Sequence, residues 1–347
     1  MLEAESSDDQ NSQGGDDRPR PRLGFLGIGW IGQHRLKSIA EARRAEIVGL
    51  ADLNPGVVAA ATLETPDADV GESLKDLLRM DLDGLVIATP TALHAGQAIA
   101  ALESNVAVFC QKPLGRTEQE TRAVIAAARR ADRLIAVDMT YRFVRGIRKI
   151  KDIIEAGDIG EVYAMDLVFH NAYGPDKPWY YDSRLAGGGC VIDLGIHLID
   201  MALWMSGSKI GGVSSRLFAQ GKRVGPQDDR LEDYAAVRLD LESGATANLS
   251  CSWHLPAGRD AVIRASFYGT KGGLAVANVN GSFYDFTAEQ FSGTSRKVLD
   301  EPPDSWGGRA VVAWAERLAE SSAFDPEIES AVEVARVIDA IYANEWR

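Results

Sequence analysis

Short apolar runs alternate with helical patterns over the first part of the chain. The apolar runs predict strands at residues 23–27, 46–52, 83–88, 106–110 and 134–138. Segments rich in Ala, Leu, Arg and Glu lie between them and predict helices at residues 30–43, 55–64, 73–80, 91–103 and 117–131. Strands that alternate with helices in this way are typical of βαβ units around a parallel sheet.

The pattern changes after residue 141. One more helix is predicted at about residues 143–156, followed by longer runs in which apolar and polar residues alternate. These runs include residues 162–171, 231–241, 245–254 and 261–268, and they predict a mainly antiparallel sheet. Helical stretches at residues 309–320 and 327–343 end the chain. The predicted fold class is therefore α/β, with a doubly wound parallel sheet followed by an α/β domain with a large, open, mainly antiparallel sheet.

Length and composition fit this division. The chain has 347 residues, 46% of them hydrophobic, and the length favours about two domains. We predict a first domain at residues 22–140, a second at residues 141–325, and a C-terminal helix at residues 326–347 that packs back on the body. Residues 1–21 are polar, without the apolar segment of a signal peptide, and we interpret them as a disordered acidic tail.

The charge and the cysteines exclude several functions. With 37 Lys and Arg against 50 Asp and Glu, the net charge of −13 disfavours nucleic acid and anionic membranes as partners. No apolar run reaches the roughly 18 residues of a membrane span. The three cysteines, Cys110, Cys190 and Cys251, match neither a disulfide framework nor a metal site. We therefore expect no metal and a cytoplasmic location.

A glycine motif follows the first predicted strand. Gly27, Gly29 and Gly32 form G-x-G-x-x-G, with Trp30 and Ile31 between the last two, and the motif opens a predicted helix. In a Rossmann domain these glycines permit a tight turn, the approach of a pyrophosphate, and close packing of helix on strand. The alternatives are a glycine-rich turn in an unrelated α/β protein and a methyltransferase-type domain.

Asp52 ends the second predicted strand, where a dinucleotide-binding domain carries an acidic residue. Its carboxylate can accept hydrogen bonds from the adenosine ribose and would repel a 2′-phosphate. The motif and Asp52 together predict NAD as the cofactor, with NADP as the alternative.

Residues 187–204 read as a mostly apolar helix whose ionisable residues are Asp193, His197 and Asp200. Spacings of four and three place them on one face, which we expect to border a cleft. A neutral imidazole is a competent base for the proton of a secondary alcohol, and Asp193 could orient the ring or hold a substrate hydroxyl. A buried histidine with a purely structural role is the alternative.

Two further segments stand at the carboxyl edge of the predicted parallel sheet, where such sheets bind ligands. Lys112 follows the strand at residues 106–110 and could stabilise a developing alkoxide, or be an ordinary surface lysine. Thr89 and Pro90 follow the strand at residues 83–88, where the proline ring could pack on the dinucleotide or simply start a loop.

Together these motifs resemble the family of glucose-fructose oxidoreductase, inositol dehydrogenase and MocA. The resemblance covers about residues 22–347. It rests on the glycine motif, on residues 88–94 (Ala-Thr-Pro-Thr-Ala-Leu-His), on Gln111-Lys112-Pro113 and on residues 193–200 (Asp-Leu-Gly-Ile-His-Leu-Ile-Asp). It implies a Rossmann domain joined to an α/β domain whose open sheet mediates a homodimer or homotetramer.

The resemblance also implies roles for particular residues. His197 would act as acid or base, Lys112 would polarise the reacting oxygen, and Asp193 would complete the catalytic set. The residues expected at the cofactor are Gly27, Gly29, Trp30, Ile31, Gly32, Asp52, Thr89, Pro90, His94, Gln111, Lys112 and Trp179. The residues expected at the substrate are Lys112, Arg142, His170, Asp193 and His197.

One position departs from the family. The common Glu-Lys-Pro is Gln111-Lys112-Pro113 here, so an amide replaces a carboxylate beside the lysine. The amide still offers hydrogen bonds but carries no charge.

The resemblance implies hydride transfer between NAD(P) and a secondary hydroxyl or ketone of a sugar, inositol or related polyol. One alternative is a sugar oxidoreductase that recycles a tightly bound nicotinamide between two substrates. Another is a catalytically silent dinucleotide-binding sensor subunit.

Overall fold

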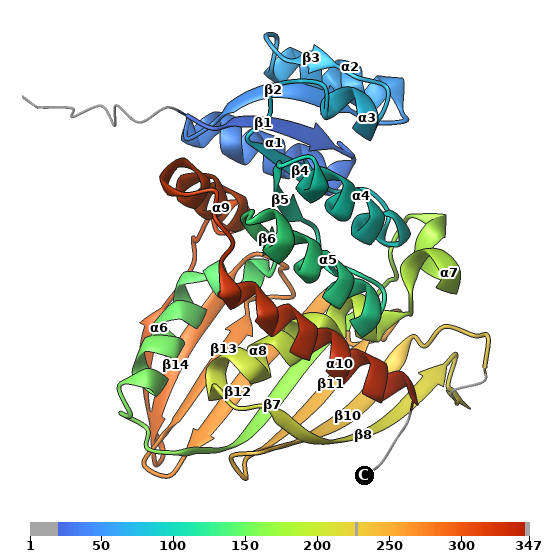
Figure 1. Ribbon diagram of the computed structural model, residues 1–347. Helices are drawn as coiled ribbons and strands as arrows, with labels where there is room; N and C mark the ends of the chain where they lie inside the picture. Colours follow the sequence, from blue (N-terminus) through green and yellow to red (C-terminus); the bar gives the residue numbers. More distant parts are fainter. Residues whose placement is uncertain (1–19, 226–227, 344–347) are drawn as a thin grey trace, which may run out of the picture.

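Two sheets, one above the other, organise the molecule (Figure 1). The computed structural model describes residues 20–225 and 228–343. Most of the predicted acidic tail, residues 1–19, lies outside the described residues. The chain forms the upper sheet first, then the lower one, and its last two helices return to the upper sheet and to the space between the two.

The upper sheet has six parallel strands in the order β3-β2-β1-β4-β5-β6. The strands are β1 (Arg22–Leu26), β2 (Glu46–Ala51), β3 (Asp69–Val70), β4 (Gly84–Ile87), β5 (Ala107–Cys110) and β6 (Ile135–Val137). All four residues of β4 and of β5 are buried, as a sheet covered on both faces requires. The predicted doubly wound parallel sheet is confirmed. The sequence missed β3 because its two residues are both exposed.

Helices connect these strands and cover both faces of the sheet. They are α1 (Trp30–Ala42), α2 (Pro55–Glu64), α3 (Leu74–Leu77), α4 (Thr91–Glu103) and α5 (Glu118–Ala131). Side chains of Asn54, Ser73 and Thr117 accept hydrogen bonds from the first turns of α2, α3 and α5. The strand order reverses between β1 and β4, which opens a crevice at the carboxyl ends of these strands.

The lower sheet has nine strands in the order β15-β14-β13-β12-β7-β11-β10-β8-β9. The strands are β7 (Val162–Asn171), β8 (Ile210–Ala219), β9 (Lys222–Val224), β10 (Tyr234–Leu241), β11 (Thr246–Ser252), β12 (Ala261–Gly269), β13 (Gly273–Asn278), β14 (Phe286–Ser292) and β15 (Ser295–Asp300). Among the described strands of this sheet, only β7 and β11 pair in parallel, so the predicted, mainly antiparallel sheet is confirmed.

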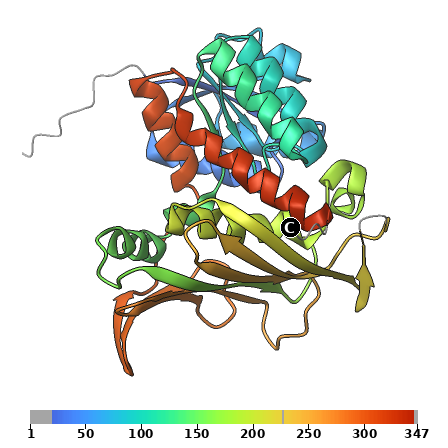
Figure 2. The same ribbon diagram turned by 60° about the horizontal axis from the view of Figure 1, so that its bottom comes forward.

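Helices cover one face of the lower sheet. They are α6 (Arg145–Glu155), α8 (Ile196–Ser206) and α10 (Ser330–Ala343), and Figure 2 shows no helix of the described chain on the opposite face. Alternate residues of β7 follow this division, since Met165, Leu167 and Phe169 are buried under the helices while Asp166 is exposed. The expectation of a homo-oligomer through the open face stays a prediction.

Helix α9 (Arg309–Glu320) packs on the upper sheet, although we grouped its residues with the second domain. Trp314 is 2% exposed, and its ring centroid lies 5.7 Å from that of Phe109 in β5. A side chain on Gly84 of β4 would collide with the same indole, 2.6 Å away. The amphipathic pattern predicted this helix but could not reveal which sheet it covers.

Contrary to the expectation that no apolar run reaches the length of a membrane span, one stretch of the described chain, Ser183–Ser206, is long and apolar enough to cross a membrane by length and composition. Its most apolar part is 83% buried inside the protein, as is typical of a core helix.

Replacing Trp314 by alanine should lower the free energy of unfolding by about 3–5 kcal/mol, because it leaves a cavity between α9 and the upper sheet. Trp30→Ala is the matched control: this indole is 67% exposed, so the change should stay within about 0.5 kcal/mol. Urea unfolding measures both. Equal losses in the two variants would contradict the packing of α9 described above.

Candidate active site

The glycine motif forms a turn between β1 and α1 at the crevice. Gly27 has a φ of 82°, and a Cβ there would lie 2.7 Å from the Ala88 backbone. A Cβ on Gly32 would lie 2.1 Å from the Gly27 carbonyl oxygen, whereas a Cβ on Gly29 would meet nothing within 4 Å. Helix α1 starts at Trp30 without a side-chain cap or an acidic residue in its first turn. The turn therefore offers open space and a helix N-terminus to a phosphate group.

Asp52 lies directly behind this turn. One carboxylate oxygen accepts a hydrogen bond from the Ile28 backbone N–H at 2.7 Å, and the other accepts from the Asn54 N–H at 2.8 Å. The carboxylate therefore holds the glycine turn against the end of β2, at the position predicted for a ribose contact.

Lys112 follows β5 by two positions and contacts Asp193 in the lower part of the molecule. Its ammonium donates to the Asp193 carboxylate at 2.7 Å and to the Asp193 carbonyl oxygen at 2.6 Å. The other carboxylate oxygen accepts from the Trp253 indole N–H at 3.0 Å. Asp193 thus fixes the lysine, and the structure does not place it against the His197 ring as the sequence analysis suggested.

A π-helical turn, Val191–Gly195, precedes α8 and carries Asp193. The expected regular helix over residues 187–204 is therefore wrong at its start. The buried carboxylate of Glu232 accepts hydrogen bonds from the N–H groups of Gly189 (3.1 Å) and Val191 (2.9 Å) and from the Tyr342 hydroxyl (2.8 Å). Burial raises the pKa of Glu232. Such wide turns are frequent at functional sites, and this one changes the angular spacing on which the single-face prediction rested.

His197 lies on α8 and borders a cavity of about 380 Å³ that Lys112 also lines. The two residues are far apart in sequence, so the fold brings them together as predicted from the motifs. Burial, and to a smaller extent the Lys112 ammonium, lowers the pKa of His197 well below its usual range. No other described residue forms a hydrogen bond with the ring. A neutral imidazole with a free nitrogen at a cavity can accept a proton.

Tyr141 belongs to the same cavity, and the sequence analysis missed it. Its ring packs edge-on against His197, with centroids 4.9 Å apart, and lies tilted against Trp306, with centroids 5.1 Å apart. Burial raises its pKa, so the phenol keeps its proton. No described residue is a hydrogen-bond partner of this hydroxyl. Its position just after the strand at residues 134–138, at the same sheet edge as Lys112, was the available signal.

Aromatic side chains form most of the remaining wall. Trp30 comes from the glycine turn, and Phe283, Tyr284 and Trp306 come from loops of the lower sheet and the segment before α9. Flat apolar rings beside a few polar groups are typical of small-molecule sites.

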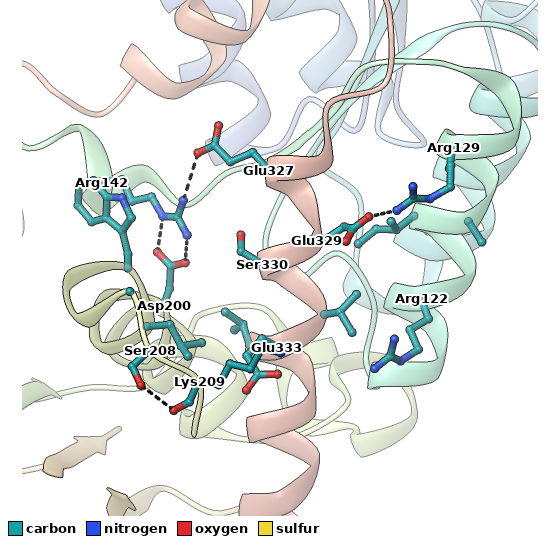
Figure 3. A pocket seen from close by; sticks show the side chains of 17 residues that line it. Arg122, Arg129, Arg142, Asp200, Ser208, Lys209, Glu327, Glu329, Ser330 and Glu333 are labelled. Atoms are coloured by element: carbon teal, nitrogen blue, oxygen red, sulfur yellow. Dashed lines mark hydrogen bonds and ion pairs between the residues drawn. The ribbon is translucent and has the colours of Figure 1, made fainter. Parts of the chain in front are cut away.

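Arg142 does not reach this cavity. Its guanidinium donates to both carboxylate oxygens of Asp200, at 2.9 and 2.5 Å, and lies 3.9 Å from Glu327 (Figure 3). This group borders a separate, larger hollow of about 790 Å³ between α5, α8 and α10. Arg129 in the same hollow pairs with Glu329, so both Arg142 and Arg129 already have anionic partners. Arg142 and Asp200 therefore brace α8.

Thr89, Pro90 and His94 lie at the carboxyl end of β4, next to the turn that follows β5. The His94 ring nitrogens lie 2.7 Å from the carbonyl oxygens of Thr89 and Pro113, and the ring is 2% exposed. Burial lowers the pKa of His94. His94 thus ties the turn after β4 to the one that carries Lys112, and only Thr89 and Pro90 remain near the crevice surface.

His170 and Trp179 lie outside the cavity. His170 sits on the helix-free face of the lower sheet, where its Nδ1 is 2.8 Å from the Ser252 hydroxyl and its ring stacks on Tyr234. Trp179 stacks on Tyr180 with centroids 3.8 Å apart, in the loop before the π-helical turn. His170 is therefore separated from Lys112 by the sheet itself, because its neighbour Phe169 is the residue that packs against His197.

No group of three or more His, Cys, Asp or Glu residues in the described part of the chain could hold a metal ion. Cys110, Cys190 and Cys251 are all buried and unbridged.

A Rossmann-type domain with an open glycine turn, beside a cavity with a lysine and a neutral histidine, defines a nicotinamide-dependent oxidoreductase. Residues 22–139 match the model of an oxidoreductase family with an NAD-binding Rossmann fold, and residues 147–275 match the GFO/IDH/MocA C-terminal domain. The chain belongs to the Gfo/Idh/MocA family of oxidoreductases.

Individual relatives agree. The chain is 29% identical to the uncharacterized oxidoreductase YrbE of Bacillus subtilis, over 74% of this chain and 73% of that protein. It is 27% identical to inositol 2-dehydrogenase 3 of Saccharopolyspora erythraea, over 90% of this chain and 84% of that one. Levoglucosan dehydrogenase, solved with NADH and L-sorbose, has the same fold, with a TM-score of 0.80, 21% identity and coverage of 94% and 98%.

The pKa of His197 can be measured directly. In an NMR titration of the imidazole C–H signals, His197 should remain neutral at pH 6, where an imidazole in water is mostly protonated. Lys112→Met should raise the His197 pKa, because it removes a nearby positive charge. Lys149→Met, on the far side of α6 beside Asp300, is the control and should leave the titration unchanged. A His197 signal that titrates near pH 6.5 in the wild type would contradict the burial argument.

Proposed function

We propose that this protein transfers a hydride between NAD and a secondary hydroxyl or ketone of a sugar, inositol or related polyol. The observation that carries the proposal is the shared cavity of Lys112 and His197 at the carboxyl edge of the dinucleotide-binding sheet. The family relationship supports it, since its members include inositol dehydrogenases.

The glycine turn and Asp52 fit the cofactor. Gly29 leaves room for a pyrophosphate, the uncapped start of α1 supplies N–H donors, and Asp52 stands where the adenosine ribose would lie. When bound, the nicotinamide supplies the hydride acceptor. The carboxylate of Asp52 favours NAD over NADP because it would repel a 2′-phosphate.

The lysine and the histidine divide the proton chemistry. The Lys112 ammonium has three N–H donors, and Asp193 receives two of them, so the third can reach a substrate oxygen in the cavity. That hydrogen bond stabilises the negative charge that develops on the oxygen. His197 accepts the proton from the hydroxyl oxygen as the hydride leaves the carbon that bears this oxygen, and it returns the proton in the reverse reaction.

The aromatic wall suits a ring-shaped polyol. Trp306 and Tyr284 offer flat apolar faces, to which the C–H side of a sugar or cyclitol ring can pack. The Tyr141 hydroxyl is an additional hydrogen-bond donor for a substrate oxygen next to His197. This division between one polar end and one aromatic wall sets the orientation of the substrate.

Lys112→Ala and His197→Ala should each lower kcat by at least about a hundredfold, while the dissociation constant of NADH changes by less than threefold. A panel of sugars, cyclitols and their ketones, followed by nicotinamide absorbance, measures turnover. Asp166→Asn, on the helix-free face of the lower sheet, serves as a control outside the cavity. Wild-type turnover in both alanine variants would refute the assignment of these two residues.

Gel filtration and the same panel of compounds distinguish this proposal from the two alternatives, a recycled cofactor and a sensor subunit. A nicotinamide absorbance that survives gel filtration of the purified protein would indicate a permanently bound cofactor that is recycled between two substrates. Dinucleotide binding without turnover of any compound would favour a sensor subunit.

Asp52→Ala should weaken NAD binding about tenfold or more and narrow the preference for NAD over NADP, because the repulsion of a 2′-phosphate is lost. Titrations of NADH and NADPH fluorescence measure both constants. Asp52→Asn, which keeps an acceptor for the Ile28 N–H, separates the charge from the support of the glycine turn. Unchanged selectivity in both variants would refute the ribose role.

A further inference from the structure

A buried ion pair lies in the wall of the reaction cavity, and the mechanism above does not use it. Arg35 on α1 donates through Nε to the Asp138 carboxylate at 2.6 Å. The two side chains are 4% and 0% exposed, and both residues line the cavity together with Lys112 and His197. Buried ion pairs contribute little net stability, so a pair at this place calls for a functional explanation.

Gln111 connects this pair to the lysine. Asp138 directly follows β6, Gln111 directly follows β5, and the Asp138 N–H donates to the Cys110 carbonyl oxygen at 2.9 Å. The Gln111 side-chain amide donates to the same Asp138 oxygen that Arg35 contacts. The carboxylate therefore holds the residue that immediately precedes Lys112.

The second oxygen of Asp138 is buried and has no hydrogen-bond partner among the residues that the structure describes. Most buried carboxylate oxygens in proteins have a partner, since each unmet hydrogen bond costs about 1–3 kcal/mol. This unpartnered oxygen belongs to a residue that lines the cavity.

Charges around the cavity balance in pairs. Arg35 faces Asp138, and Lys112 faces Asp193. His197 is neutral because burial and Lys112 lower its pKa.

The neighbouring titratable groups add no charge. Burial, followed by Arg35, lowers the pKa of His34, whose ring nitrogen lies 3.1 Å from the Arg35 guanidinium. Burial raises the pKa of Cys110, Tyr141 and Tyr284, so these three groups stay protonated.

We propose that Asp138 is a positioning residue that sets the charge of the reaction cavity: it neutralises Arg35, holds Gln111 next to Lys112, and so allows the positively charged oxidised nicotinamide to bind there. This inference rests on the proposed function, because it requires the nicotinamide ring in this cavity. It also accounts for Gln111. The Gln111 amide itself carries no charge, and the carboxylate that contacts it comes from Asp138 at the end of the adjacent strand.

The ring of oxidised nicotinamide is positive and that of reduced nicotinamide is neutral, so the ratio of their dissociation constants reports the charge of the cavity. Asp138→Asn removes a negative charge and should raise Kd(NAD⁺)/Kd(NADH) about tenfold. Arg35→Gln removes the positive partner and should lower the same ratio about tenfold. Isothermal titration calorimetry gives both constants without a substrate.

A charge transplant completes the test. The double variant Asp138→Asn/Gln111→Glu exchanges the carboxylate and the amide between two side chains that are hydrogen-bonded to each other. The ratio Kd(NAD⁺)/Kd(NADH) should then return to within about threefold of the wild-type value. Asp166→Asn, on the exposed far face of the lower sheet, is the matched control and should change nothing. If Asp138→Asn does not fold, Arg35→Gln and the transplant variant decide the question.

The inference predicts opposite shifts of Kd(NAD⁺)/Kd(NADH) in the two single variants, because they remove opposite charges. An unchanged ratio in the folded variants, or a shift in the same direction for both, would overturn it and would indicate loosened packing instead. So would a transplant variant that behaves like Asp138→Asn. A wild-type protein that binds neither dinucleotide would overturn the proposed function as well. If NAD⁺ and NADH both bind tightly but the ratio of their dissociation constants does not change in the single variants, only this inference is overturned.

Discussion

The contact between Lys112 and Asp193 is the interaction on which the site depends. It joins the end of a strand in the upper sheet to a π-helical turn above the lower sheet, and it uses two of the three donors of one ammonium group. Because Trp253 and Glu232 fix the Asp193 side chain and the start of its turn, the lysine is held from the lower half of the molecule. Neither half alone contains the reaction cavity.

The parts of the fold that the sequence predicts are those with a local physical cause. The parallel strands are buried apolar runs, and the glycine turn requires backbone conformations and spaces that side chains exclude. His197 was predictable because it is one of few ionisable residues in a mostly apolar helix. Lys112 was predictable from its position at the carboxyl edge of the parallel sheet and from the family motif that it belongs to. The pairing of β3 and the choice of sheet that α9 covers depend on contacts between residues far apart in sequence. Such contacts produce no periodic pattern of apolar and polar residues.

The errors at the site share one origin. Helical spacing suggested that Asp193, His197 and Asp200 act together, but the π-helical turn directs Asp193 to Lys112, and Asp200 faces Arg142. Arg142 and Tyr141 are adjacent in a short 3-10 helix. The sequence analysis chose the charged Arg142, which pairs with Asp200, whereas Tyr141 is the residue that lines the cavity. A charged side chain in a motif does not reveal whether its partner is a substrate or another residue.

The last helix has a mechanical consequence. Asp339 of α10 accepts a hydrogen bond from the first N–H of α5 above it, at 2.9 Å, while Tyr342 binds Glu232 below it. Arg336 donates to the Ile210 carbonyl oxygen at the edge of the lower sheet, at 2.6 Å. Helix α10 is thus hydrogen-bonded to both halves of the molecule, and these contacts oppose a hinge motion that would separate them. A wall that is already ordered before a ligand binds lowers the entropic cost of binding.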